Sequence, residues 1–289
     1  MLQGSIPALI TPFDAHEKID VQAFEVLLDF HKKKPSPAWV LLGSTAEALC
    51  LQNSEREQIL SIAKEHIDRD KVVVGISAAT TQQVLKYAEQ AYAHGYSYGL
   101  VATPHYLKPT QAELIQHYKT IAKESGLKII FYTVPSRTGV DFSDDTIVTL
   151  AQQKQIVALK DAGTEVDRVS RLKPYLPKDF TYLSGDDAST LIRLFAGAEG
   201  VISVCANIIP DKMQMICDLA AQDDWVKARE EFVNIQGILN ALSCGGNPVV
   251  IKYLVAKLLK IPYHMRKPLI ALDREQQAQI DRKLENIIL

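Results

Sequence analysis

Short runs of β-branched, apolar residues recur along the chain and constrain its fold more than any other feature. There are eight such runs, most of them unbroken rather than alternating, and their starts lie about 20 to 33 residues apart. Unbroken apolar runs are typical of strands covered on both faces, as in a parallel sheet. The predicted strands are 6–11, 39–43, 72–77, 99–103, 129–134, 156–160, 180–184 and 201–204.

Segments with helical spacing of apolar residues separate these runs. In 20–33, for example, Phe24, Leu27, Leu28 and His31 follow the i, i+3, i+4, i+7 pattern of one helix face. Eight β-then-α units in series predict an α/β fold of the (β/α)₈ TIM-barrel type. An open doubly wound sheet is the alternative, but no G-x-G-x-x-G follows the first run. The other predicted helices are 53–67, 81–94, 111–125, 143–152, 165–175, 188–197 and 211–221.

The last part of the chain has helical patterns without further strands. The predicted helices there are 225–242, 248–260 and 273–288. We therefore predict a catalytic barrel over residues 1–222 and an appended helical region over 223–289. This region is expected to cover the barrel or to build a subunit contact.

Composition excludes several classes of protein. The net charge of −2 and the pI near 6.4 give no electrostatic basis for binding nucleic acid. The four cysteines include no C-x-x-C pair and the histidines are dispersed, so neither a zinc site nor a disulfide framework is expected. There is no apolar stretch of membrane-spanning length and no signal-peptide pattern, so we predict a cytoplasmic protein without membrane contact.

Lys160 follows four apolar residues at the end of the sixth predicted strand. Active sites of (β/α)₈ barrels lie at the carboxyl ends of the strands. Burial lowers the pKa of a lysine, and a neutral amine in an apolar pocket forms Schiff bases with carbonyl compounds. The alternative is a strand-end lysine that reaches solvent along its flexible stem.

Other strand ends supply groups that suit the same chemistry. Ser44 and Thr45 offer hydroxyls and backbone N–H groups for a carboxylate, Tyr132 can shuttle a proton, and Arg137 can bind a second carboxylate. Together with Lys160 they indicate a 2-oxo acid substrate. Each also has an ordinary structural reading: a helix cap, a packed tyrosine and a surface ion-pair partner.

The pair Asp186-Asp187 raises the question of a metal site. Adjacent residues on an extended chain point in opposite directions, and Asp187 is also a good N-cap for the next helix. We therefore predict no metal.

Four motifs together resemble the dihydrodipicolinate synthase / N-acetylneuraminate lyase family, and the resemblance covers essentially the whole chain. Within the family, the second motif resembles the synthases, because the sugar-acid lyases generally lack its Ser-Arg-Thr stretch. The motifs are Gly-Ser-Thr-Ala-Glu at 43–47, Tyr-Thr-Val-Pro-Ser-Arg-Thr-Gly at 132–139, Leu-Lys-Asp-Ala at 159–162 and Leu-Ser-Gly-Asp-Asp at 183–187.

The resemblance implies a cofactor-free, pyruvate-dependent barrel enzyme whose synthases condense pyruvate with aspartate semialdehyde on the route to diaminopimelate and lysine. It implies a homotetramer made of two tight dimers. The resemblance implies that Lys160 forms the imine and that Tyr132, Thr45 and Tyr106 form a proton relay, with Tyr106 reaching a neighbouring subunit. It implies that Ser44 and Thr45 bind pyruvate and that Arg137 binds the carboxylate of the aldehyde. It also implies that the backbone carbonyls of Gly185 and Ile202 line the pocket.

Two departures from the family pattern stand out. Ala46 replaces a usual glycine, and if that position needs a positive φ, its Cβ costs about 1 kcal/mol. The positions of the family's lysine-effector pocket also lack an acidic group and gain a cation, so we predict weak or absent lysine inhibition. Those positions hold Ala48, Asn53, Arg56, Ala79, Gln83 and His105.

Two other functions remain as alternatives. One is a retro-aldol lyase on a sugar acid of the N-acetylneuraminate or 2-keto-3-deoxygluconate type, which would use the same lysine. The other is a non-catalytic regulatory barrel, against which the retained Lys160, Tyr132, Thr45 and Tyr106 argue.

Overall fold

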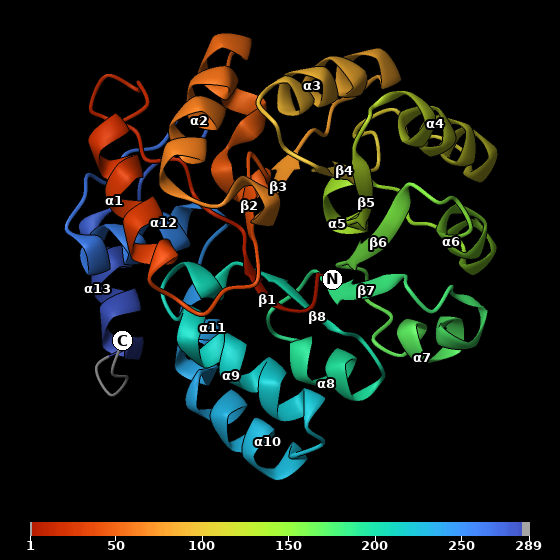
Figure 1. Cartoon of the computed structure of the whole chain (residues 1–289). Coiled ribbons are helices and arrows are strands. Elements are labelled where there is room, and N and C mark those ends of the chain that lie inside the picture. The colour runs from red at the N-terminus through yellow and green to blue at the C-terminus, as the bar shows by residue number, and fades with distance from the viewer. Residues whose placement is uncertain (1, 285–289) are drawn as a thin grey trace.

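The computed structural model describes residues 2–284, and its eight strands form one parallel sheet in the order β1-β8-β7-β6-β5-β4-β3-β2. A parallel bridge between Ala8 and Val40 joins β1 to β2 and closes the barrel. Helices ring the strands on the outside (Figure 1). The predicted TIM barrel is therefore confirmed. The strands are β1 (Gly4–Pro7), β2 (Trp39–Leu41), β3 (Val72–Gly75), β4 (Tyr98–Ala102), β5 (Lys128–Thr133), β6 (Ile156–Asp161), β7 (Thr181–Ser184) and β8 (Gly200–Ser203).

The predicted helices are present, with small differences at their ends. The helix expected over 165–175 is a short α-helix that continues as a 3₁₀ turn at Lys173–Tyr175, where Pro174 removes a backbone donor. The helices are α1 (Val21–Lys32), α2 (Asn53–His66), α3 (Thr81–Ala93), α4 (Gln111–Glu124), α5 (Pro135–Thr138), α6 (Asp144–Ala151), α7 (Arg168–Leu172), α8 (Thr190–Phe195) and α9 (Pro210–Ala221).

The C-terminal region is helical, as predicted. Its first predicted helix is broken at Ile235 into α10 (Trp225–Asn234) and α11 (Gln236–Leu242), followed by α12 (Val249–Leu259) and α13 (Arg274–Leu284). The predicted residues 285–288 of the last helix lie outside the described residues. Apolar side chains of α11 and α12 belong to the same buried cluster as the helices around the barrel. The division at residue 222 into two units stays a prediction.

Alternation along the strands separates two apolar cores. Ala158 on β6 packs inside the barrel, whereas Leu159 packs between the sheet and the outer helices. Lys160, one residue on, therefore faces the barrel interior again, and Asp161 faces outward.

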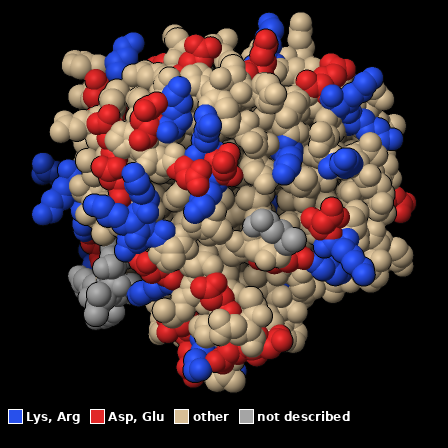
Figure 2. Space-filling model, in the orientation of Figure 1, with Lys and Arg blue, Asp and Glu red and all other residues tan. Residues whose placement is uncertain are grey.

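Surface charges of both signs are interspersed over the face shown in Figure 2.

One buried histidine predicts how stability depends on pH. His31 on α1 is fully buried, and neither ring nitrogen has a hydrogen-bond partner among the described residues. Burial, with a smaller effect of Lys34, lowers the pKa of His31 to about 3. The unfolded chain therefore takes up a proton near pH 6.5, whereas the folded chain does not. Stability is full above that pH and falls as the pH drops toward 3.

We expect His31 to cost the fold about 2 kcal/mol between pH 6.5 and pH 5. Urea unfolding at these two pH values should show that His31→Leu loses less free energy of unfolding on acidification than the original chain. The same change at the exposed His16 serves as the control. An equal acid loss in the His31 and His16 variants would contradict this origin.

Candidate active site

Lys160 lies at the carboxyl end of β6, inside the barrel mouth, and only 5% of its surface is exposed. It is paired in the parallel ladder with Tyr132 of β5. The Lys160 Nζ lies 4.3 Å from the centroid of the Tyr132 ring. The two side chains therefore lie beside each other, as their positions at the ends of neighbouring strands predict.

The surroundings of Lys160 favour its neutral amine. Burial is the main cause that lowers the Lys160 pKa to about 8; the Asp187 carboxylate opposes this shift and Arg137 adds to it. Burial likewise raises the pKa of Tyr132 to about 12. At neutral pH the site thus combines a lysine that deprotonates readily with a tyrosine that keeps its proton.

A buried ionic cluster on the outer side of the sheet holds the ends of β5 and β6 in register. The outward-facing Asp161 accepts a hydrogen bond from the Gly163 N–H at 2.7 Å and lies 3.2 Å from Nη1 of the fully buried Arg193. The neighbouring Thr133 hydroxyl donates to Asp141 at 2.6 Å. Because Asp161 and Thr133 directly follow Lys160 and Tyr132, these contacts hold the backbone from which the two side chains project.

The hydroxyl loop after β2 is a 3₁₀ turn over Ser44–Ala46. The positive φ of this motif belongs to Glu47, at 54°, and not to Ala46. The strain expected at Ala46 is therefore absent, because its Cβ sits on ordinary backbone. Glu47 instead accepts a 2.6 Å hydrogen bond from the buried Lys252 of α12, which ties the loop to the C-terminal region.

Arg137 lies on α5, directly after β5, with its guanidinium exposed in the barrel mouth. One of its nitrogens donates to the Asn247 carbonyl at 3.0 Å. The Asn247 side-chain amide in turn donates to the Thr45 hydroxyl at 3.0 Å. Asn247, which the sequence did not single out, thus links Arg137 to the hydroxyl loop.

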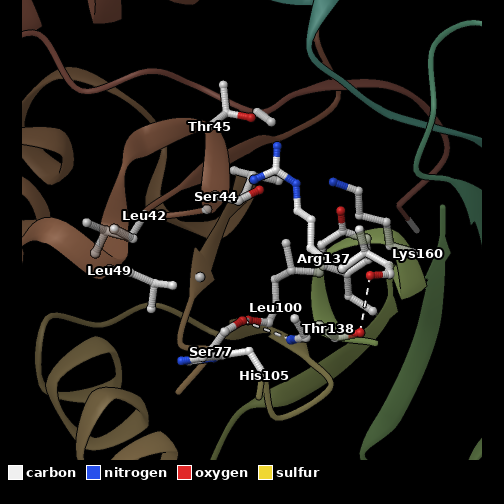
Figure 3. Close-up of a pocket in the computed structure, with 18 of the residues that line it drawn as sticks. Leu42, Ser44, Thr45, Leu49, Ser77, Leu100, His105, Arg137, Thr138 and Lys160 are labelled. Atoms are coloured by element: carbon white, nitrogen blue, oxygen red, sulfur yellow. Dashed lines mark hydrogen bonds between the residues drawn. The ribbon is translucent and has the colours of Figure 1, made fainter. Parts of the chain in front are cut away.

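The barrel mouth holds a cavity with two lobes of about 420 and 570 Å³. The wall common to both lobes contains all the predicted binding and reactive groups except Tyr106, Gly185 and Ile202. In Figure 3 the Lys160 amine and the Arg137 guanidinium lie close together near Ser44 and Thr45, with His105 at the far end of the first lobe. The shared wall is formed by Ser44, Thr45, Tyr132, Val134, Arg137 and Lys160.

The remaining predicted site residues lie in different places. Gly185 lines the second lobe, and a Cβ there would approach Ala162 to 2.9 Å, so the close contact of these loops requires glycine. Ile202 packs inside the barrel and lines neither lobe. Tyr106 is 91% exposed and also lines neither lobe of its own chain.

Asp187 does not have the position expected from the sequence. It does not cap the following helix, whose N-cap is Ser189. The exposed Asp186 accepts the Ser189 N–H instead, while Asp187 is buried and accepts from the N–H groups of Val204 and Cys205. The opposite orientation of the two carboxylates agrees with their expected alternation. No group of metal ligands is found among residues 2–284.

A (β/α)₈ barrel with a buried lysine, a tyrosine and an arginine around its mouth defines a class of lysine-dependent barrel enzymes. The model of the dihydrodipicolinate synthetase family matches residues 1–287. The chain therefore belongs to this family and is an enzyme of it. No helix within residues 2–284 has the length and apolar character required to span a membrane.

Individual relatives match over almost their whole length. A 4-hydroxy-tetrahydrodipicolinate synthase of Dechloromonas aromatica is 37% identical, over 97% of this chain and 96% of the relative. The crystal structure of dihydrodipicolinate synthase from Aquifex aeolicus has a TM-score of 0.94 at 34% identity, covering 98% of this chain and 97% of that one. The enzyme from Acinetobacter baumannii, solved in complex with pyruvate, has a TM-score of 0.92 at 34% identity, covering 99% and 98%.

Proposed function

We propose that this chain catalyses the 4-hydroxy-tetrahydrodipicolinate synthase reaction, the condensation of pyruvate with L-aspartate-4-semialdehyde in diaminopimelate and lysine biosynthesis. The observation that carries the proposal is the wall between the two lobes, where Lys160 and Arg137 lie together. An amine for a ketone and a guanidinium for a second carboxylate suit a substrate pair of this kind. The full-length relatives with this activity support it.

In the proposed first step, the neutral Lys160 amine attacks the ketone carbon of pyruvate. The carbonyl oxygen leaves as water and the nitrogen becomes a protonated imine. Ser44 and Thr45 would hold the pyruvate carboxylate through their hydroxyls and backbone N–H groups. Loss of a methyl proton then gives the enamine, whose carbon attacks the aldehyde. Finally the substrate's own amine displaces Lys160 and closes the ring.

Proton transfer in these steps is assigned to Tyr132 and Thr45. The Tyr132 hydroxyl keeps its proton because burial raises its pKa. The Thr45 oxygen accepts from Asn247, which leaves the Thr45 hydroxyl hydrogen available to a neighbour. Tyr106 would complete the relay only in the site of a second subunit, which its exposure here allows.

The second lobe is the proposed place for the aldehyde substrate. Arg137 would bind its carboxylate, and Gly185 lines the same lobe. Ile202 would contribute through its backbone carbonyl only. No cofactor is needed, because the covalent imine on Lys160 supplies the electron sink.

A homotetramer remains our proposal for the assembly. The exposed large apolar side chains of the described residues include Tyr106 and Leu107 beside the barrel mouth and Ile192 and Phe195 on α8. Such side chains suit contacts between subunits. Light scattering coupled to size-exclusion chromatography measures the assembly directly. Cytoplasmic localisation likewise stays a prediction.

Substrate choice tests the proposed reaction. Purified protein should consume pyruvate together with aspartate semialdehyde, in an assay that follows the cyclic product. Cleavage of N-acetylneuraminate or 2-keto-3-deoxygluconate without synthase activity would establish the lyase instead. Absence of all three activities, together with no borohydride-stable pyruvate adduct, would leave the non-catalytic barrel.

We expect lysine to inhibit the chain weakly, by less than about twofold at millimolar concentration. Arg56 is buried, donates to the Gly75 carbonyl at 2.6 Å and stacks 3.8 Å from the Tyr87 ring centroid, so its positive charge is fixed. Gln83 offers no negative charge for the ligand's amine. Initial rates titrated with lysine measure the effect.

The matched variant is Gln83→Glu, which restores a carboxylate without touching Arg56. It should bind lysine more tightly than the original chain. Strong inhibition of the original chain, or no difference between the two proteins, would show that these positions do not set lysine sensitivity.

A further inference from the structure

Asp187 is a buried carboxylate that the proposed mechanism does not use. It follows β7 and lies against the end of β8. Its Oδ2 accepts the Val204 and Cys205 N–H groups, each at 2.9 Å, and the Ser203 hydroxyl also donates to the carboxylate. Burial raises the pKa of Asp187, and the hydrogen bonds from Ser203, Cys205 and Val204 oppose this shift because each is stronger to a charged oxygen.

The other oxygen of the same group has no partner. Oδ1 of Asp187 is buried and lacks a hydrogen bond within the described part of the chain. A buried carboxylate oxygen without a donor is costly and calls for an explanation. Asp187 lines the second lobe of the cavity together with Lys160. The carboxylate thus lies at the wall of the lobe in which the imine would form, and its charge raises the Lys160 pKa against the effect of burial.

A cation forms in this lobe during the proposed reaction. When the Lys160 amine adds to pyruvate and water leaves, the nitrogen carries a fixed positive charge. Deep in the barrel mouth, water screens such a charge poorly. An ionised carboxylate in the same lobe therefore stabilises the iminium relative to the neutral amine.

We infer that Asp187 is the counter-ion of the iminium on Lys160, held in place by its hydrogen bonds from Val204 and Cys205. The inference rests on the proposed function, because it requires a Schiff base. Asp187 would act through charge and would transfer no proton.

The other charged and titratable groups nearby do not fill this role. Arg137 is a cation and repels the iminium. Asp186 is exposed, so water screens it, and its carboxylate is occupied by the Ser189 N–H and hydroxyl. Tyr132 stays protonated because burial raises its pKa. Burial and Asp187 together raise the pKa of the Cys205 thiol, which stays neutral.

The test is the pyruvate concentration that gives half-maximal borohydride trapping, measured in the original chain and in Asp187→Asn. The amide is isosteric and its oxygen can still accept both backbone N–H groups, so a purely structural role would survive. At about pH 9.5 the free Lys160 is neutral, so the Asp187 charge stabilises only the iminium. Removing that charge should therefore raise the half-saturating pyruvate concentration about tenfold. At about pH 6.5 the free Lys160 is an ammonium, which the Asp187 charge stabilises as much as it stabilises the iminium. The half-saturating pyruvate concentration should therefore change by no more than about twofold.

Asp186→Asn removes the same formal charge from the same loop and should shift trapping at the higher pH far less than Asp187→Asn. The counter-ion role is overturned if Asp187→Asn leaves the half-saturating pyruvate concentration unchanged at the higher pH, or raises it equally at both pH values. If Asp187→Asn does not fold, a pyruvate-induced infrared difference spectrum of the original chain decides: a buried protonated carboxyl in the adduct overturns the inference. Failure of the original chain to form any adduct would instead overturn the proposed function.

Discussion

Lys160→Met should form no pyruvate adduct after borohydride reduction, and its turnover should fall by a factor of about 10³ or more. Methionine keeps the length and apolar stem of the side chain, so the buried strand end should remain packed. It lacks the amine, and within residues 2–284 no other group lines both lobes with a nucleophilic nitrogen of lowered pKa. Mass spectrometry of the trapped protein measures the adduct, and the coupled assay measures turnover.

The chain contains its own control for this experiment. Lys252 is as buried as Lys160, and burial also lowers its pKa to about 8. Its Nζ, however, is hydrogen-bonded to Glu47 at 2.6 Å, and it lines neither lobe. Peptide mapping of the original chain should find the adduct on Lys160 and none on Lys252. An adduct on Lys252, or one retained in Lys160→Met, would refute the assignment.

The pH dependence of trapping follows from the same pKa. Below pH 8 most Lys160 is an ammonium and cannot attack the ketone, because burial lowers its pKa only to about 8. The rate of adduct formation should therefore rise as the pH increases through 8 and then level off. An ordinary exposed lysine would continue to gain reactivity up to about pH 10.

Residues placed by strand periodicity were predictable from the sequence. Lys160 and Tyr132 end parallel strands that are neighbours in the sheet, so their meeting follows from the fold. The barrel itself follows from the repeated apolar runs. These features depend on local patterns that repeat along the chain, and each copy supports the others.

Residues placed by loops were not predictable in the same way. Asn247 reaches the site from a turn in the C-terminal region that has no periodicity. The sequence indicates a helix cap at Asp187, because it does not show that the loop of this residue packs on the end of β8. The positive φ fell on Glu47 rather than Ala46, one residue from the position that the motif suggested. The proposed role of Tyr106 requires a second chain, which one sequence does not place.

Arg137→Gln should raise the KM for aspartate semialdehyde about thirtyfold, with a much smaller change in the half-saturating pyruvate concentration for trapping. A hydrogen bond between charged partners contributes about 2 kcal/mol, and glutamine retains neither the charge nor the planar fork. Steady-state kinetics with each substrate varied in turn separate the two effects. Because the Arg137 charge lowers the Lys160 pKa, the trapping profile of this variant should also move to higher pH.

Arg137→Lys is the matched control, since it keeps the charge and loses the fork. Its trapping profile should stay close to that of the original chain, while its KM for the aldehyde should lie between the other two. Equal losses toward both substrates in Arg137→Gln would mean that Arg137 only supports the hydroxyl loop through Asn247. A selective rise in the KM for the aldehyde, by contrast, would identify Arg137 as the group that distinguishes a synthase from a lyase with the same lysine.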